Sequence, residues 1–408
     1  MFVRLWNASS LSERLDIASQ ISDLNPDFDH TYQKLQKGRT YLNTIPRGFV
    51  EWQLDNKRVG KPHFCLVFIP YGYTPNKKYT VKVFWHGLVS TKNSRGYIDE
   101  VIDKDAPTYK KRDYISVYPA GWKESMWWAE SQLENLDNIL AYLKRFYNID
   151  ENRVHLAGMS DGGTGAYNVA NAQPTPWASF FPYLANIAGL NALSFRQIYA
   201  ANFTNRPFLI ANAENDQVFP PRIVLPFAEL LRKAKVKMDF HMMRGAEHNM
   251  DWFPKMKSKV VKFVKKQVRN PFPNQLYWET ETTHKYQRIH WLCIDELTET
   301  PEETQRISDI NTILGINRQL FERRKMSGRV MAKKSANEVH LTTQNVKSLR
   351  LLCSPNHFDF AKPVRVFANQ QLVFEGNLQK DTHTLLKWHA IDFDRTMLFA
   401  SELKIDLA

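Results

Sequence analysis

Residues 158–162 read Gly-Met-Ser-Asp-Gly, and their types and spacing point to nucleophilic chemistry. Ser160 carries a hydroxyl that becomes a nucleophile when a nearby base removes its proton. A serine between glycines, after an apolar run and before a run of small residues, predicts a sharp turn from a strand into a helix. Such a turn lifts the hydroxyl above the sheet and brings backbone N–H groups of the helix N-terminus near a developing oxyanion. The stretch therefore predicts acyl transfer at this serine.

A nucleophilic serine needs a base, and the base needs a group that orients it. Asp216 comes directly after the predicted strand 207–213, and His248 follows the predicted strand 236–243. Both side chains then lie at the carboxyl edge of the sheet, where open α/β folds place their sites. Glu214 is a competing acid, but the apolar residues after Asp216 suit a loop packed under the histidine. We expect the aspartate and the histidine to complete a catalytic triad.

A serine nucleophile of this kind also needs donors for the oxyanion, and one of them comes from an upstream loop. His86-Gly87-Leu88 follows an apolar strand at the expected place. We expect the backbone N–H groups of Leu88, or Gly87, and of Asp161 to form the oxyanion hole. A glycine in a loop is common, so this prediction depends on the position of the tripeptide.

Tryptophans near these loops are candidates for an aromatic pocket above the serine. We expect Trp127, Trp128 and Trp252 to line it, although tryptophans also pack in cores or under loops. Such a pocket would suit a feruloyl- or aryl-type ester.

The elements that must position these loops alternate between strands and helices. Alternation of this kind predicts a mostly parallel sheet with helices on both faces. The predicted strands are 62–70, 79–85, 114–118, 153–157, 207–213 and 236–243, and the predicted helices are 133–146, 225–234 and 255–269.

Beyond residue 273 short β runs dominate. We therefore expect an α/β catalytic domain over 56–272 and a mainly-β, sandwich-like domain over 273–408. Residues 1–55 read as an N-terminal helical extension.

Composition and charge argue against several other classes of protein. The 408 residues suffice for two or three domains, and a hydrophobic content of 43% can form a large core. The net charge of +13 raises the question of nucleic acid, but the densest lysine group, 255–269, alternates with apolar residues as in a helix with a solvated basic face. We expect no nucleic-acid partner and no membrane span, since no apolar run approaches roughly 20 residues. Three scattered cysteines predict no metal site, and we expect no cofactor.

Several stretches resemble a known group of enzymes. Residues 64–75 and 83–87, the approach to the serine at 147–154, and Trp127-Trp128 look like serine esterases of the polyhydroxybutyrate depolymerase and feruloyl esterase group. The resemblance covers about residues 60–270. More loosely, the β-rich tail resembles the C-terminal module appended to many bacterial members.

This resemblance implies an α/β-hydrolase fold with Ser160 as nucleophile, His248 as base and Asp216 as orienting acid. It implies a carboxylic ester hydrolase that acts on a small-molecule or polymer-derived ester, without naming the ester. A serine peptidase on the same triad and a non-catalytic binding protein on a hydrolase fold are the alternatives. The sequence indicates no oligomeric state.

The N-terminus has no apolar segment of the kind found in signal peptides. The sequence as given therefore predicts a cytoplasmic protein, whereas a chain trimmed of its signal would be periplasmic or secreted.

Overall fold

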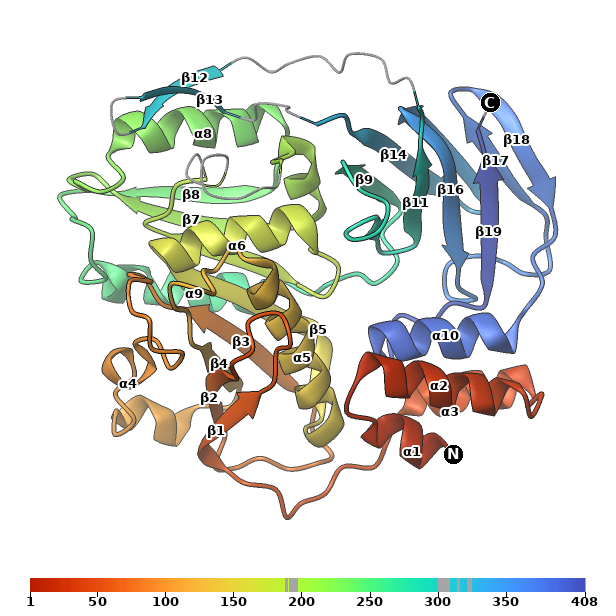
Figure 1. The fold of residues 1–408 in the computed structure, drawn as a ribbon, viewed down its shortest axis with the longest axis horizontal. Coiled ribbons are helices and arrows are strands. Elements are labelled where there is room, and N and C mark those ends of the chain that lie inside the picture. The colour runs from red at the N-terminus through yellow and green to blue at the C-terminus, as the bar shows by residue number, and fades with distance from the viewer. Residues whose placement is uncertain (188–189, 191–196, 300–308, 314–315, 321–324, 408) are drawn as a thin grey trace. The chain divides into compact units, whose positions relative to one another are not determined.

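The computed structural model describes residues 1–187, 190, 197–299, 309–313, 316–320 and 325–407 (Figure 1). The chain divides into two compact units. The first, here the α/β unit, comprises Leu42–Arg269 and Arg306–Arg324. The second, here the β-rich unit, comprises Met1–Tyr41, Asn270–Gln305 and Lys325–Ala408.

The α/β unit is built on an eight-stranded sheet in the order β1-β2-β4-β3-β5-β6-β7-β8. Strand β2 runs antiparallel to β1 and β4, and the other neighbours are parallel. The strands are β1 (Gly48–Leu54), β2 (His63–Ile69), β3 (Tyr79–Trp85), β4 (Ile115–Pro119), β5 (Ile149–Met159), β6 (Ser179–Tyr183), β7 (Phe208–Ala213) and β8 (Met238–Met243). This is the mostly parallel sheet that the sequence predicts.

Helices cover both faces of this sheet. Gly165 of α6 (Asp161–Ala172) lies against Trp85, whereas α9 (Phe253–Lys266) packs against Phe181 and Leu209. Phe84 joins the α9 cluster, and it points away from Trp85 because successive side chains of a strand alternate between faces. The helices are α5 (Glu130–Phe146), α6 (Asp161–Ala172), α8 (Pro221–Lys233) and α9 (Phe253–Lys266).

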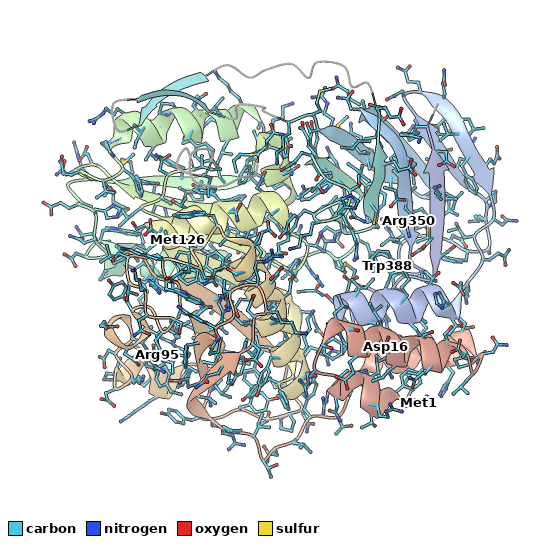
Figure 2. All side chains as sticks on the ribbon, in the orientation of Figure 1. Met1, Asp16, Arg95, Met126, Arg350 and Trp388 are labelled. Atoms are coloured by element: carbon cyan, nitrogen blue, oxygen red, sulfur yellow. The ribbon has the colours of Figure 1, made fainter. Side chains whose placement is uncertain are left out.

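The segment between β3 and β4 is irregular. It contains only the four-residue helix α4 (Ile98–Val101) and a 3-10 turn, η1 (Pro107–Lys111). Arg95, labelled in Figure 2, ties the segment to β1 through an ion pair with Glu51 at 2.8 Å, and it pairs within the segment with Asp99 at 2.9 Å. Residues 86–114, all of them described, thus contain no long helix.

Two strands of the sheet lie outside the predicted pattern. Strand β1 falls within residues 1–55, which the sequence assigns to the N-terminal extension, yet it pairs along its whole length with β2. Strand β6 contains Pro182, and a proline normally argues against a central strand because it cannot donate to the ladder.

The N-terminal helices belong to the β-rich unit. These are α1 (Phe2–Asn7), α2 (Leu11–Ser22) and α3 (Phe28–Lys37), and they share a buried cluster with α10 (Thr382–Asp392). Within this cluster, the Arg14 guanidinium donates from Nε to the carbonyl oxygen of Ala390 at 2.9 Å. The helices are therefore grouped with residues 270 onward, whereas the sequence treats them as a separate extension.

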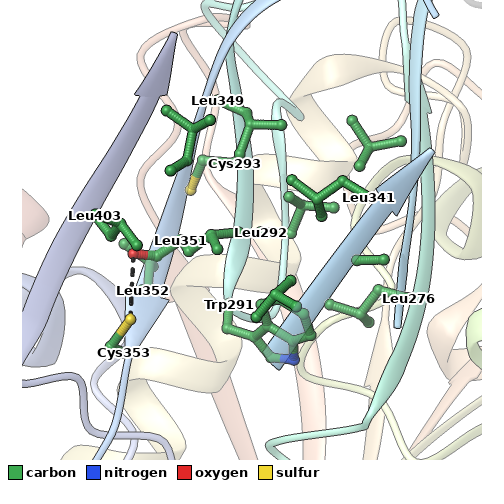
Figure 3. Close-up of a cluster of buried hydrophobic side chains, with 14 of the residues drawn as sticks. Leu276, Trp291, Leu292, Cys293, Leu341, Leu349, Leu351, Leu352, Cys353 and Leu403 are labelled. Carbon is green, nitrogen blue, oxygen red and sulfur yellow. Dashed lines mark hydrogen bonds between the residues drawn. The ribbon is translucent and has the colours of Figure 1, made fainter. Parts of the chain in front are cut away.

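Two antiparallel-rich sheets form the rest of this unit. One contains β10 (Arg288–Ile289), β11 (Leu292–Leu297), β16 (Val346–Cys353) and β19 (Ser401–Asp406). The other contains β9 (Gln275–Thr280), β14 (Gly328–Ser335), β15 (Glu338–Gln344), β17 (Val364–Ala368) and β18 (Gln371–Gly376). Both contribute to one apolar core, shown in Figure 3 with Leu276 and Leu341 from the second sheet and Leu292, Leu351 and Leu403 from the first.

Within the described residues, no helix has both the length and the apolar character needed to span a bilayer.

Candidate active site

Ser160 lies at the turn between β5 and α6 with a φ of +53°, a conformation that non-glycine residues rarely adopt. Only glycine fits at positions 158 and 162, because a side chain at either would clash with neighbouring backbone atoms. A Cβ on Gly158 would lie 2.2 Å from the carbonyl carbon of Gly162, and one on Gly162 would lie 2.2 Å from the carbonyl oxygen of Trp85. The strained serine is thus held by a turn that only glycine can build on both sides.

Ser160, His248 and Asp216 form a continuous hydrogen-bond chain. His248 Nε2 lies 2.9 Å from Ser160 Oγ, and His248 Nδ1 lies 2.7 Å from Asp216 Oδ2. A carboxylate accepts, so Nδ1 carries the ring proton and Nε2 is left to accept the hydroxyl proton. The aspartate follows β7 and the histidine follows β8, as the sequence predicts.

The Asp216 carboxylate is buried and fully hydrogen-bonded. Its Oδ1 accepts the backbone N–H groups of Val218 at 2.8 Å and Phe219 at 2.7 Å. Burial raises the pKa of Asp216, but the hydrogen bond from His248 and those from the two backbone N–H groups outweigh it, and the pKa is lowered. The carboxylate is therefore ionised at neutral pH.

Glu214, the competing acid, has another partner. Its Oε2 accepts the backbone N–H of Gly245 at 2.8 Å, in the turn that follows β8. It supports the loop that leads to His248 and does not touch the ring.

The loop after β3 lies directly beside the serine. A Cβ on Gly87 would be 3.0 Å from Ser160 Cβ. The Val89 N–H donates to Asp161 Oδ2 at 2.9 Å, which fastens this loop, with Leu88 in it, to the start of α6. Asp161 is the first residue of α6, so its own N–H has no acceptor within the helix.

The His86 side chain forms hydrogen bonds that fix this loop, a role that the sequence did not predict. Its Nδ1 lies 2.7 Å from the Gly87 carbonyl oxygen, and its Nε2 accepts the Gly121 N–H at 3.1 Å. Burial lowers the pKa of His86, so the ring is neutral and Nδ1 is the donor. The position of a histidine between a strand and a loop glycine was the only sequence signal for it.

Two of the three expected pocket tryptophans are core residues. Trp127 is 0% exposed and stacks on Trp85 with ring centroids 4.6 Å apart, while its Nε1 donates to the carbonyl oxygen of His86 at 2.8 Å. Trp252 is 4% exposed and packs on Tyr183. Trp128 is half-buried. Sequence spacing does not show which way an indole points, and here the rings of Trp127 and Trp252 lie in the core.

A groove lies beside the site. Its volume is about 600 Å³, and His86, Gly87, Met159 and Met250 line it. None of the three tryptophans contributes to its wall. The described residues contain no group of three or more His, Cys, Asp or Glu side chains placed to hold a metal ion.

Residues 101–268 match the family model described as the dienelactone hydrolase family, which is less than half of the chain. Together with the sheet order, this match confirms the predicted α/β-hydrolase fold. No curated protein matches the sequence.

Solved structures similar to this chain include esterases and peptidases. A thermostable esterase is 19% identical over 54% of this chain and 63% of its own, with a TM-score of 0.45. An acylaminoacyl peptidase of Pyrococcus horikoshii is 16% identical over 55% of this chain and 43% of its own, with a TM-score of 0.42. A ferulic acid esterase of Anaeromyces mucronatus is 17% identical over 56% and 94%, with a TM-score of 0.40. The chain thus spans less than two thirds of the first two.

Proposed function

We propose that the α/β unit is a serine hydrolase that cleaves carboxylic esters through an acyl-enzyme. The observation that carries the proposal is the chain of hydrogen bonds from Asp216 through His248 to Ser160, at 2.7 and 2.9 Å. An imidazole between an ionised carboxylate and a hydroxyl is arranged to remove the hydroxyl proton.

In the first step Ser160 Oγ attacks the ester carbonyl carbon while its proton moves to His248 Nε2. Asp216 stabilises the imidazolium that forms, because its carboxylate is ionised and hydrogen-bonded. The C–O bond to the alcohol then breaks, and His248 returns the proton to the leaving alkoxide. The products of this half-reaction are the free alcohol and an acyl group on the serine.

Water completes the cycle by the same route. His248 removes a proton from the water as its oxygen attacks the acyl carbon, and the proton then goes to Ser160 Oγ as the acyl–serine bond breaks. In both halves the oxyanion is expected to bind the N–H groups of Asp161 and of Leu88 or Gly87. Each such donor typically lowers the barrier by about 2.7–4 kcal/mol.

Hydrolysis of p-nitrophenyl acetate tests this proposal. We expect Ser160→Ala to lower kcat by about 10³-fold or more, since the nucleophile is lost. Ser258→Ala is the matched control, because Ser258 is exposed on α9 and its loss should leave the rate unchanged. Equal rates for wild type and Ser160→Ala would refute the assignment.

The same enzyme preparation separates esterase from peptidase activity. We expect hydrolysis of p-nitrophenyl acetate and no measurable hydrolysis of acylaminoacyl p-nitroanilides. Faster cleavage of the anilides would favour the peptidase alternative, and cleavage of neither substrate would favour a non-catalytic binding protein.

A further inference from the structure

The groove beside the site runs across one face of the central strands. Its floor comes from side chains of β3, β4, β5 and β6, and α9 forms one wall through Phe253, Val260 and Val264. The irregular segment between β3 and β4 contributes the opposite wall through Ile102 and Tyr109. All of these residues belong to the α/β unit.

The groove lies where the segment between β3 and β4, all of it described, forms no long helix over this side of the sheet. The β3 side chains that face α6 are buried, including Val83 and Trp85, whereas Lys82 and Phe84 on the groove side are only half-buried. A central strand of a parallel sheet is normally buried on both faces. An uncovered stripe on such a strand is therefore a place for a ligand.

One end of the groove adjoins the nucleophile. Gly87 and Met159 line this end. Met159 is bonded to Ser160 in the chain, and a Cβ on Gly87 would lie 3.0 Å from Ser160 Cβ. Because residue 87 has no side chain, nothing from it fills the space beside Ser160. The middle of the floor is apolar, with Phe84, Ala157 and Phe181.

The other end is cationic. Arg112 donates to Ser116 Oγ at 2.8 Å and to Tyr118 Oη at 2.9 Å, and Lys82 Nζ lies 3.6 Å from the centroid of the Tyr114 ring. Neither cation forms an ion pair with a carboxylate in the part of the chain that the structure describes. Burial and the neighbouring Arg112 lower the pKa of Lys82 to about 8, against the smaller opposing effect of the Asp113 carboxylate, which does not pair with Lys82. Two half-buried cations without a carboxylate partner favour an anion from outside.

His155 adds a donor at this end. It pairs in register with Lys82, lines the groove and is 1% exposed. Its Nδ1 lies 2.8 Å from Ser179 Oγ, but its Nε2 has no hydrogen-bond partner among the described residues. Burial lowers the pKa of His155 to about 3, so the ring is neutral. When the Ser179 hydroxyl donates to Nδ1, Nε2 carries the proton and needs an acceptor.

The length of the groove sets the length of its occupant. His155 and Met159 lie four residues apart on β5, which corresponds to about 13 Å along a strand. An extended aliphatic chain covers that distance with about ten carbons, given C–C bonds of ~1.5 Å.

We propose that the groove binds the acyl chain of the substrate, a medium-length aliphatic chain that ends in a carboxylate. The carboxylate binds Lys82, Arg112 and His155 Nε2, the methylene groups lie over Phe84 and Ala157, and the ester carbonyl reaches Ser160. This inference rests on the proposed esterase function and adds the substrate class to it. An unsubstituted acyl chain would place a methyl group against two cations, which is the less favourable arrangement.

Three p-nitrophenyl esters test this inference: the acetate, the dodecanoate and the monoester of dodecanedioic acid. We expect kcat/KM for the dodecanedioic monoester to exceed that for the dodecanoate by about tenfold or more, because hydrogen bonds to a charged group are worth about 1.5–3 kcal/mol. Lys82→Met should remove most of this preference, whereas Lys78→Met should keep both the preference and the acetate rate. Lys78→Met is the matched control, since Lys78 is exposed and its loss removes the same charge.

A direct binding measurement tests the groove without requiring that the protein hydrolyse an ester. In calorimetric titrations of the full chain with free dodecanedioate, we expect binding to wild type and to Lys78→Met, and about tenfold weaker binding to Lys82→Met. Hydrolysis of the acetate without any preference for the carboxylate-ended ester, or equal dodecanedioate affinity of Lys82→Met and wild type, would overturn the inference. Failure to hydrolyse all three esters would instead refute the esterase proposal. The dodecanedioate titrations would then still show whether the groove binds a carboxylate-ended chain.

Discussion

At the scale of single residues, the carboxylate of Asp216 sets the orientation and the tautomer of the His248 ring. It is buried, accepts two backbone N–H groups on one oxygen and holds the ring proton of His248 on the other. The imidazole is thereby fixed in the tautomer whose Nε2 faces the serine hydroxyl. The residue types and their order along the chain were sufficient to predict that these three side chains lie together, because each follows a recognisable strand; their catalytic roles stay predictions.

Asp216→Asn tests this orienting role. The amide matches the carboxylate in size but lacks its charge and favours the wrong imidazole tautomer, so we expect kcat for p-nitrophenyl acetate to fall by about 10²–10⁴-fold with little change in KM. Glu214→Gln is the control, since its amide oxygen still accepts the Gly245 N–H and the activity should stay within about threefold. A wild-type kcat for Asp216→Asn would contradict the role.

Other residue-level features were beyond sequence reasoning. The direction of an indole depends on tertiary packing, so Trp127 and Trp252 were expected at a pocket and are found in the core. Likewise, Lys82 and Arg112 are far apart in the sequence and flank no motif, and only the paired strands bring them to one end of a groove. Nothing in their sequence context distinguishes them from solvated surface cations.

At the scale of elements, the tight packing of α6 against the sheet positions Ser160. Gly162 touches the backbone of the residue that ends β3, and Gly163 lies against the backbone of Tyr183 at the end of β6. The helix can begin directly after Ser160 only because these positions have no side chain. This explains why the glycine spacing was a reliable sequence signal.

We expect Gly162→Ala to destabilise the protein by about 1–3 kcal/mol or more, since its Cβ would meet the Trp85 carbonyl oxygen at 2.2 Å and the backbone must shift. The free energy of unfolding in urea measures this. Gly72→Ala is the control, because a Cβ there meets nothing within 4 Å, and we expect a change within about 0.5 kcal/mol. Equal stability of the two variants would show that the backbone at Gly162 and Trp85 can move apart at little cost.

The elements that followed a clean pattern were predicted well. Strand β3 has the predicted bounds, 79–85, because its apolar side chains alternate, and α9 buries Met256 and Val264 while its lysines are exposed. Strand β6 was missed because of its proline, and β1 because it lies within the residues assigned to the N-terminal helical extension. The missing helix over β3 and β4, which creates the groove, leaves no positive signal in a sequence.

At the scale of the whole molecule, chain order and spatial grouping differ. Residues 1–41 belong with the β-rich unit at the other end of the chain, through a core that includes Leu35 and Leu386. No local pattern reveals a pairing between segments more than 300 residues apart, and this is why the sequence suggested an independent extension. The predicted boundaries, compartment and lack of a nucleic-acid partner stay predictions.

Leu35→Ala tests this grouping. Leu35 is fully buried in the cluster shared by α3 and α10, so we expect the β-rich unit to lose about 2–5 kcal/mol of stability. Hydrogen exchange read separately on α10 and on the strands of the α/β unit reports where protection is lost, and we expect the loss on α10. Leu24→Ala is the control, because Leu24 is 69% exposed. Unchanged protection of α10 in Leu35→Ala would contradict a shared core.

The most direct test of the central claim is labelling with a fluorophosphonate, followed by peptide mapping in a mass spectrometer. Only a serine activated by its histidine reacts readily with such a probe. We expect one adduct per chain, located on Ser160, and none in the Ser160→Ala or His248→Ala variants. Either no adduct on the wild-type protein, or an adduct at a different residue, would contradict the account.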